Sequence, residues 1–346
     1  MALPSFRSAF HLDRAFNWFP GHMARGLREI QTQLQKTDVV VEVRDARIPL
    51  SSINPQLEQL ANHKDHVVVY NKADLADPAS RPSIIQNIRR FTGQQQVLFT
   101  STHIDRDVRR IIEYAAARAR TDPLRYPSVT VTVIGMPNVG KSSLINAMRR
   151  IGVGKGKAAP TGANPGVTRR VAGVIRVLED PPVYLVDSPG VMVPYIADPI
   201  RSFKVALTGG MKEDVTDVEV LADYLLYQLN QKRNRTYCDM FHLTEPSDDI
   251  AQVLPAIARR IGALKKGGGH HLDWAARHFI KQFQLGKFGR YTLDDMTQDN
   301  VEMFFRTYQR PVRSRTRQRK EERAERIQAR RAKQLAKGTH KQSYQR

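Results

Sequence analysis

The feature that most constrains the fold of this chain is a glycine-rich stretch, GMPNVGKSS, at residues 135–143. An apolar run, SVTVTVIG at 128–135, precedes the stretch, and the helical pattern LINAMRRI follows it. The spacing Gly-x4-Gly-Lys-Ser is typical of a loop whose backbone N–H groups surround phosphate oxygens at the positive end of a helix. The stretch therefore predicts a strand, a phosphate-binding loop and a helix in succession.

Each residue type in this loop has a physical role. Lys141 is expected to reach the β- and γ-phosphates, and the Ser142 hydroxyl is expected to ligate Mg²⁺. A glycine turn that binds no ligand is disfavoured, because a strand and a helix flank the loop. The expected nucleotide contacts in this stretch are Asn138, Val139, Gly140, Lys141, Ser142 and Ser143.

Two segments that follow the loop complete a predicted metal and γ-phosphate site. Asp187 begins DSPG at the end of the apolar run PVYLV, where it is placed to hold the Mg²⁺ hydration shell, and the Gly190 N–H is placed to meet the γ-phosphate. Thr168 lies in GANPGVTRR, a segment suited to a switch whose threonine joins Mg²⁺ only while the γ-phosphate is present. The alternative for Thr168 is an ordinary loop threonine. Lys141 and Thr168 are also expected to act in catalysis.

A base-reading motif comes unusually early in the chain, as NKAD at 71–74 after the apolar run HVVVY. The Asp74 carboxylate can accept hydrogen bonds from guanine, while Asn71 braces the loop and the Lys72 stem covers the base. Adenine would leave that carboxylate unpaired, which is costly for a buried group. Thr100 and Ser101, at another strand end, are expected to support the base. Taken alone, NKAD would favour a helix start with Asp74 as the N-cap, but the four other compatible motifs reverse that preference.

The order of these motifs is that of a GTPase whose chain has been cut and rejoined. The base reader and its support precede the phosphate loop, whereas they normally follow it. WFPGHMARGLREI at 18–30, DARIPLSSINP at 45–55 and GMPNVGKSSLIN at 135–146 resemble the circularly permuted GTPases, closest to the subfamily that assembles the large ribosomal subunit. A doubly wound sheet tolerates such a cut because chain ends usually lie close together at the surface.

The expected fold class is α/β: a circularly permuted P-loop GTPase domain with a mostly parallel sheet, then a smaller all-helical domain and a basic tail. Apolar runs alternate with helical patterns up to about residue 200, after which only helical spacing remains. The predicted divisions are a mitochondrial targeting segment at 1–16, the GTPase domain at 17–200, the helical domain at 201–310 and the tail at 311–346.

Charge and cysteine content suggest partners and a compartment. Lys and Arg outnumber Asp and Glu 55 to 34, and residues 311–346 alone carry a net charge of +10. Such an excess favours a polyanionic partner. Cys238 is the only cysteine, which excludes an internal disulfide and fits a reducing compartment. The resemblance and the short basic N-terminus together imply the mitochondrial matrix, the mitochondrial large ribosomal subunit with its rRNA, and other assembly factors as partners, with peripheral inner-membrane association and a monomeric state.

The resemblance also implies how catalysis proceeds. Val191 directly follows DSPG and cannot orient water as a glutamine does. Asn138 resembles the residue that holds K⁺ near the transferred phosphate in related GTPases. His22, in WFPGHM, resembles a histidine proposed to act on the attacking water, with packing or an RNA contact as its alternative. We expect slow hydrolysis of GTP to GDP and phosphate by the chain alone, stimulated by the ribosome.

Two other functions fit parts of the sequence. An RNA-binding factor that holds GTP without hydrolysing it would use the same nucleotide motifs and the same basic tail. A membrane-surface GTPase would use the tail on anionic lipid, but the tail lacks a bulky apolar face.

Overall fold

A computed structural model of the chain describes residues 6–10, 22–94, 96–153, 174–188, 198–211, 217–265 and 268–308. Thr168, Gly190 and the tail at 311–346 lie outside the described residues, as do residues 1–5 and 11–16 of the expected targeting segment. One compact unit extends to Phe305, and a second begins at Arg306. The division into a GTPase domain and a helical domain near residue 200 stays a prediction.

One mixed sheet forms the centre of the first unit. Its strands are β1 Val39–Asp45, β2 Asp65–Asn71, β3 Val97–Phe99, β4 Val129–Gly135, β5 Ile175–Leu178 and β6 Val183–Asp187. Their order is β3-β2-β1-β4-β6-β5, and every neighbouring pair from β3 to β6 is parallel, whereas β5 runs antiparallel to β6. The expected doubly wound, mostly parallel sheet is thereby confirmed.

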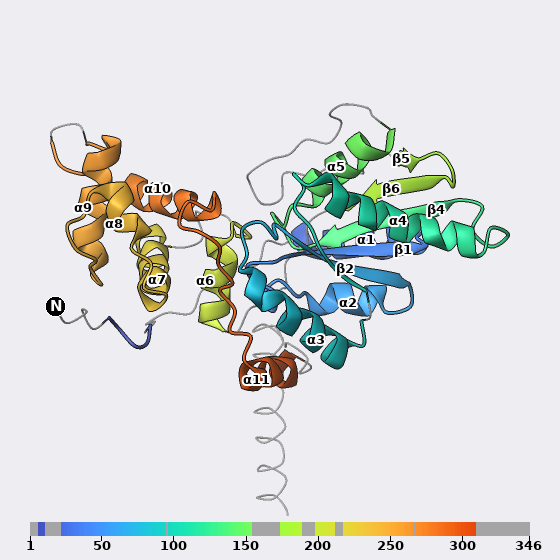
Figure 1. Cartoon of the computed structure of the whole chain (residues 1–346), viewed down its shortest axis with the longest axis horizontal. Helices are drawn as coiled ribbons and strands as arrows, with labels where there is room; N and C mark the ends of the chain where they lie inside the picture. Colours follow the sequence, from blue (N-terminus) through green and yellow to red (C-terminus); the bar gives the residue numbers. More distant parts are fainter. Residues whose placement is uncertain are drawn as a thin grey trace, which may run out of the picture. The chain divides into compact units, whose positions relative to one another are not determined.

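Helices cover both faces of this sheet (Figure 1). Those of the sheet region are α1 His22–Leu34, α2 Pro55–Ala61, α3 Arg81–Thr92, α4 Asp105–Thr121 and α5 Lys141–Val153, with a short 3₁₀ turn at Pro78–Ser80. Val40 of β1 and Ile134 of β4 pack with α1 and α2 in one cluster. Val41 and Val43, on the opposite face of β1, belong to the main core together with residues of α4 and α5. β1 is buried along its whole length because helices lie over both of its faces.

The rest of the unit is helical, as the sequence predicts. It contains α6 Pro199–Leu207, α7 Val218–Gln231, α8 Thr236–Phe241, α9 Ile250–Ile261 and α10 Leu272–Gln284, and α11 Gln298–Tyr308 begins in it. Asp217 and Asp249 cap α7 and α9, since each carboxylate accepts from backbone N–H groups of the first turn. α6 packs on α7 and α10. Arg201 of α6 also donates to the carbonyl oxygens of Ser51 and Ile53 in the loop after β1, so α6 contacts both the sheet region and the helical region.

A short N-terminal segment, residues 6–10, packs on the helical region. The Arg7 guanidinium donates to both carboxylate oxygens of Asp223 at 2.8 and 2.9 Å, and its Nε lies 3.2 Å from the Asp248 carboxylate. The Phe10 ring stacks edge-on against Phe203 of α6 and Tyr224 of α7. Part of the segment expected to target the chain is therefore in contact with the folded core.

No helix in the described part of the chain combines the length and apolar character needed to cross a membrane.

Candidate nucleotide-binding site

Most of the predicted site residues within the described chain lie at one edge of the sheet. The base-reading motif follows β2, the phosphate loop follows β4, and Asp187 ends β6. These strands are parallel, so their carboxyl ends meet at the same edge, which is where open α/β sheets bind ligands. The two motifs that are 64 residues apart in sequence are consequently neighbours in space.

The phosphate loop has the conformation that its glycines permit. Gly140 has φ +97°, and a Cβ there would lie 2.3 Å from the Asn71 Nδ2. Asn138 also adopts a left-handed conformation, with φ +55°. Lys141, the first residue of α5, is buried, and its Nζ donates to the Met136 carbonyl oxygen at 2.9 Å. The Lys141 side chain thus bonds back to the start of the loop, and its predicted reach to the β- and γ-phosphates stays a prediction.

The predicted metal site has donors that fit Mg²⁺. Asp187 is buried at the end of β6, and its Oδ1 has no hydrogen-bond partner among the described residues. Burial raises the pKa of Asp187, while Lys141 and the Ser188 N–H oppose that rise. Burial also lowers the pKa of Lys141 to about 8, against the attraction of Asp187. A buried carboxylate oxygen without a partner, close to the hydroxyl-bearing first turn of α5, suits a hydrated magnesium ion.

The base-reading loop is hydrogen-bonded directly to the phosphate loop. The Asn71 Nδ2 donates to the Val139 carbonyl oxygen at 3.0 Å, and the Lys72 Nζ donates to the Asn138 carbonyl oxygen at 2.6 Å. These two bonds join the loops to each other, while the predicted bracing role of Asn71 toward a bound base stays a prediction. Thr100 supports the bond made by Asn71, because its hydroxyl lies 3.3 Å from the Asn71 Oδ1.

The remaining base-contacting candidates lie beside this loop. Asp74 is half-buried and Ser101 is buried, while Ser142 and Ser143 are half-buried in the first turn of α5. The Ala73 N–H donates to the Thr100 carbonyl oxygen at 3.0 Å, which holds the base-reading loop against the end of β3. His22 is the first residue of α1, and its predicted role on the attacking water stays a prediction.

Two charged residues at the end of β1 were not predicted as part of the site. The Arg47 guanidinium donates to both carboxylate oxygens of Asp45 at 3.0 and 2.7 Å, and the Lys72 Nζ lies 3.0 Å from the same carboxylate. Burial alone would raise the pKa of Asp45, but Arg47 and Lys72 outweigh burial and hold that pKa below its usual range. The sequence feature that could have indicated these two residues is DAR at 45–47, which ends a predicted strand just before the strand that leads into NKAD.

Asn138 has a contact that its predicted role did not include. Its Nδ2 donates to the Gly209 carbonyl oxygen at 2.7 Å, just beyond the end of α6. The residue expected to hold K⁺ thus also ties the phosphate loop to the segment after α6. The K⁺ role stays a prediction.

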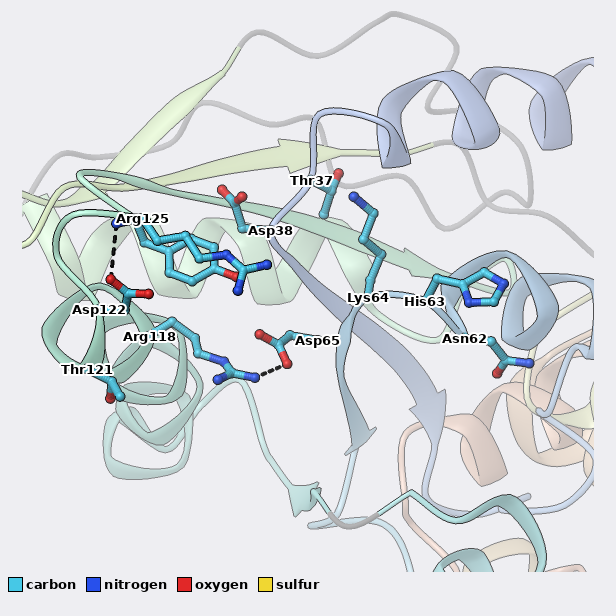
Figure 2. Close-up of a pocket in the computed structure, with 11 residues that line it drawn as sticks. Thr37, Asp38, Asn62, His63, Lys64, Asp65, Arg118, Thr121, Asp122 and Arg125 are labelled. Carbon is cyan, nitrogen blue, oxygen red and sulfur yellow. Dashed lines mark hydrogen bonds and ion pairs between the residues drawn. The ribbon is translucent and has the colours of Figure 1, made fainter.

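A separate pocket of about 820 Å³ lies at the opposite edge of the sheet. Figure 2 shows Asp65, the first residue of β2, pointing toward Arg118 of α4, with which it is paired, while Asp38 lies just before β1. Both acidic and basic side chains line this pocket, and none of the nucleotide-site residues does.

Comparison with known proteins identifies relatives that cover most of the chain. A family model described as 50S ribosome-binding GTPase matches residues 130–257. The mitochondrial ribosome-associated GTPase 1 of Xenopus tropicalis is 38% identical over 293 residues, which cover 80% of this chain and 94% of that protein. The protein of the same name from Bos taurus is 39% identical over 307 residues, covering 84% and 92%. GNP-bound YlqF from T. maritima has a similar fold, with a TM-score of 0.52, 22% identity and coverage of 78% and 97%.

The geometry of the loops and the comparisons point to the same family of proteins. A base-reading loop that precedes the phosphate loop in sequence is bonded to it in space, and the relatives match along nearly their whole lengths. The chain therefore belongs to the family of mitochondrial ribosome-associated GTPases and has the circularly permuted GTPase fold.

Proposed function

We propose that this protein hydrolyses GTP as an assembly factor for the large subunit of the mitochondrial ribosome. The observation that carries the proposal is the direct bonding of the base-reading loop to the phosphate loop through Asn71 and Lys72. That bonding supports the proposal that one site reads guanine and binds phosphate. Family membership supports the ribosomal setting.

In the proposed mechanism the chain binds and orients GTP at the carboxyl edge of the sheet. Asp74 accepts from the guanine, and Lys141 moves from the Met136 carbonyl to the phosphates. Ser142, Asp187 and Thr168 would hold Mg²⁺, which neutralises charge on the phosphate oxygens when bound. The Gly190 N–H senses the γ-phosphate, so binding and hydrolysis bias the segment that leads into α6.

Catalysis itself is proposed to need two further parts. Asn138 would help hold K⁺ near the transferred phosphate, and His22 would orient the attacking water. Asn138 is in the phosphate loop, and His22 is the first residue of α1. We propose slow hydrolysis by the isolated chain and faster hydrolysis on the ribosomal particle.

The proposed partner is the maturing mitochondrial large subunit, with its rRNA as the direct contact. Arg259, Arg260 and Lys265 are exposed in and just after α9, and Trp274 of α10 is 61% exposed. Exposed basic and aromatic side chains together suit phosphates and unstacked bases. The matrix, a monomeric state, other assembly factors and peripheral attachment to the inner membrane belong to the same proposal.

The test is phosphate release by the full chain with and without mitochondrial large subunits, in K⁺ and in Na⁺. We expect stimulation by the subunits and a requirement for K⁺. Lys141→Ala should weaken GTP binding by on the order of tenfold or more, because a charge-assisted contact is lost. Arg150→Ala is the matched control on α5, since Arg150 is paired with Asp105 on the surface.

The alternatives separate in the same experiment. A chain that binds both GTP and the particle yet releases no phosphate under any of these conditions would be a GTP-holding RNA-binding factor. Co-sedimentation with anionic vesicles in place of ribosomal subunits would indicate a membrane-surface GTPase.

A further inference from the structure

Three successive carbonyl oxygens at the end of α6 each accept a hydrogen bond from a different part of the fold. Gln284 of α10 donates its Nε2 to the Leu207 carbonyl oxygen at 3.2 Å. The Arg47 Nη2, from the end of β1, donates to the Thr208 carbonyl at 3.3 Å, and the Asn138 Nδ2 donates to the Gly209 carbonyl at 2.7 Å. The last carbonyls of a helix have no partner within the helix, so these side chains satisfy them.

The contacts of Arg47 and Asn138 with the end of α6 are linked to each other by a ring of hydrogen bonds and ion pairs. Arg47 holds Asp45, Asp45 holds the Lys72 Nζ at 3.0 Å, and Lys72 donates to the Asn138 carbonyl at 2.6 Å. Asn138 then reaches Gly209, the residue after the carbonyl that Arg47 contacts. We call these residues the Asp45–Arg47 network: Asp45, Arg47, Lys72, Asn138, Thr208 and Gly209.

Burial makes this network rigid. Asp45 and Arg47 are each 2% exposed or less, and their double hydrogen bond fixes the planar guanidinium in one orientation. Two charges taken out of water are held together strongly, and removal of one leaves the other unpaired. A shift of the base-reading loop or of the phosphate loop must therefore be matched at residues 208 and 209.

The end of α6 is in turn coupled to the helical region. The Gln284 contact joins it to α10, and the side chain of Phe203 packs against Tyr224 of α7 with ring centroids 5.2 Å apart. This route from the nucleotide to the helical region starts at the base and the phosphate loop. It is separate from the route proposed above, in which Gly190 acts through the chain segment that leads directly into α6.

We propose that the Asp45–Arg47 network and the end of α6 form a joint that transmits nucleotide occupancy to α10, with Asp45, Arg47 and Gln284 as positioning residues. Asp45 and Arg47 set the base-reading loop against α6, and Gln284 passes the position of α6 to α10. The joint rests on the proposed function only in requiring that the site binds a guanine nucleotide.

The test measures amide hydrogen exchange of the full chain, without nucleotide and with saturating GDP, over two segments: α6 with the turn after it (199–211), and α10 with its C-cap (272–285). Affinity for GDP is measured separately for every variant. In the unaltered chain, GDP slows exchange in both segments. In Gln284→Ala the slowing persists in α6 and disappears from α10, while the affinity for GDP is unchanged.

Arg47→Met interrupts the joint one step earlier. The slowing disappears from both segments at saturating GDP, and the affinity for GDP falls by about tenfold because the base-reading loop loses its brace. The two measurements are independent, since saturation removes the effect of the weaker affinity.

Each variant has a matched control. Gln282→Ala changes a neighbouring residue of α10 whose side chain pairs with His278, away from α6. Arg44→Met also removes a buried arginine that is paired with a carboxylate two residues away, in this case Glu42. Unlike Arg47, Arg44 contacts neither the nucleotide loops nor α6 in the described structure. Both controls keep the slowing in α6 and α10.

Slowing in α10 that survives in Gln284→Ala would overturn the joint, as would GDP binding to the unaltered chain without any change in α6. If Arg47→Met fails to fold, the Gln284→Ala result alone decides. Absence of guanine-nucleotide binding by the unaltered chain would overturn the proposed function and the joint together, and the separate affinity measurement reveals that case.

Discussion

Single residues decide whether the two loops of the site can approach each other, and Gly140 is the clearest case. Its φ of +97° is unfavourable for any side chain, and a Cβ there would collide with the Asn71 amide at 2.3 Å. We expect Gly140→Ala to lower the free energy of unfolding by more than 1 kcal/mol, about the cost of the backbone conformation alone. GDP binding, measured by calorimetry, should weaken as well, because Asn71 must leave Val139.

Gly93, the C-cap of α3, offers a matched control for that substitution. Its φ is +71°, but a Cβ there would meet no atom within 4 Å. Gly93→Ala should therefore show only the backbone cost, about 1 kcal/mol, with GDP affinity unchanged. Equal effects of the two substitutions on GDP affinity would contradict the clash with Asn71.

The Glu42 carboxylate should make the free energy of unfolding depend on pH in the acidic range. Burial would raise the pKa of Glu42, but Arg44 and His66 beside it outweigh burial and lower the pKa from 4.5 to about 2. The stabilisation is complete above pH 4.5 and is lost as the pH falls towards 2. Glu42→Gln lacks this carboxylate, so the unaltered chain should be more stable than the variant at neutral pH. In urea unfolding, that difference in the free energy of unfolding should shrink by on the order of 3 kcal/mol as the pH falls through this interval. A difference in the free energy of unfolding that stays constant from pH 6 to pH 3 would be inconsistent with the lowered pKa of Glu42.

Among the elements, the N-terminal segment at 6–10 has the most specific consequence. The half-buried Phe10 ring contacts aromatic rings of α6 and α7, so Phe10→Ala should lower the free energy of unfolding by about 2 kcal/mol. Ser8→Ala is the control, because the Ser8 side chain is exposed and its backbone carbonyl still accepts from Tyr227. A chain that begins at residue 17 should be destabilised at least as much, as thermal unfolding would reveal.

The elements near the site were largely predictable from local pattern. The apolar runs at 38–47 and 128–135 became β1 and β4, and the helical spacings at 217–231 and 273–286 became α7 and α10 with ends shifted by one or two residues. Gly140 and Lys141 were predictable because their spacing between a strand and a helix defines the phosphate loop, and Asn71 was predictable only because NKAD was considered together with that loop and the other motifs. Burial on both faces explains why the strands read as continuous apolar runs.

What local pattern missed depends on contacts between distant segments. Asn138 meets Gly209 across 71 residues, and Arg7 meets Asp223 across 216. No periodicity in the sequence marks either pair, since the partner is a backbone carbonyl in one case and a half-buried aspartate in the other. Arg47 was missed for the same reason: its partner Thr208 is fixed only once α6 has packed.

At the scale of the whole molecule, the basic tail should affect particle binding and leave the nucleotide site unchanged. Residues 311–346 carry a net charge of +10, so their removal should weaken binding to mitochondrial large subunits and reduce its dependence on salt concentration. Sedimentation at several salt concentrations measures both effects. GDP affinity of the shortened chain should equal that of the full chain. Unchanged salt dependence would mean that other residues contact the phosphates.

The permuted order of the motifs also has a consequence for synthesis. The base-reading loop at 71–74 is made early, but its partners Val139 and Asn138 follow more than 60 residues later, and Gly209 later still. The contact of Arg7 with Asp248 forms later than these, because Asp248 is synthesised 241 residues after Arg7. As a chain emerges from its N-terminus, the nucleotide site cannot close until α6 exists, and the first residues dock among the last. Nucleotide binding by nascent chains of increasing length should therefore appear only after α6 has emerged.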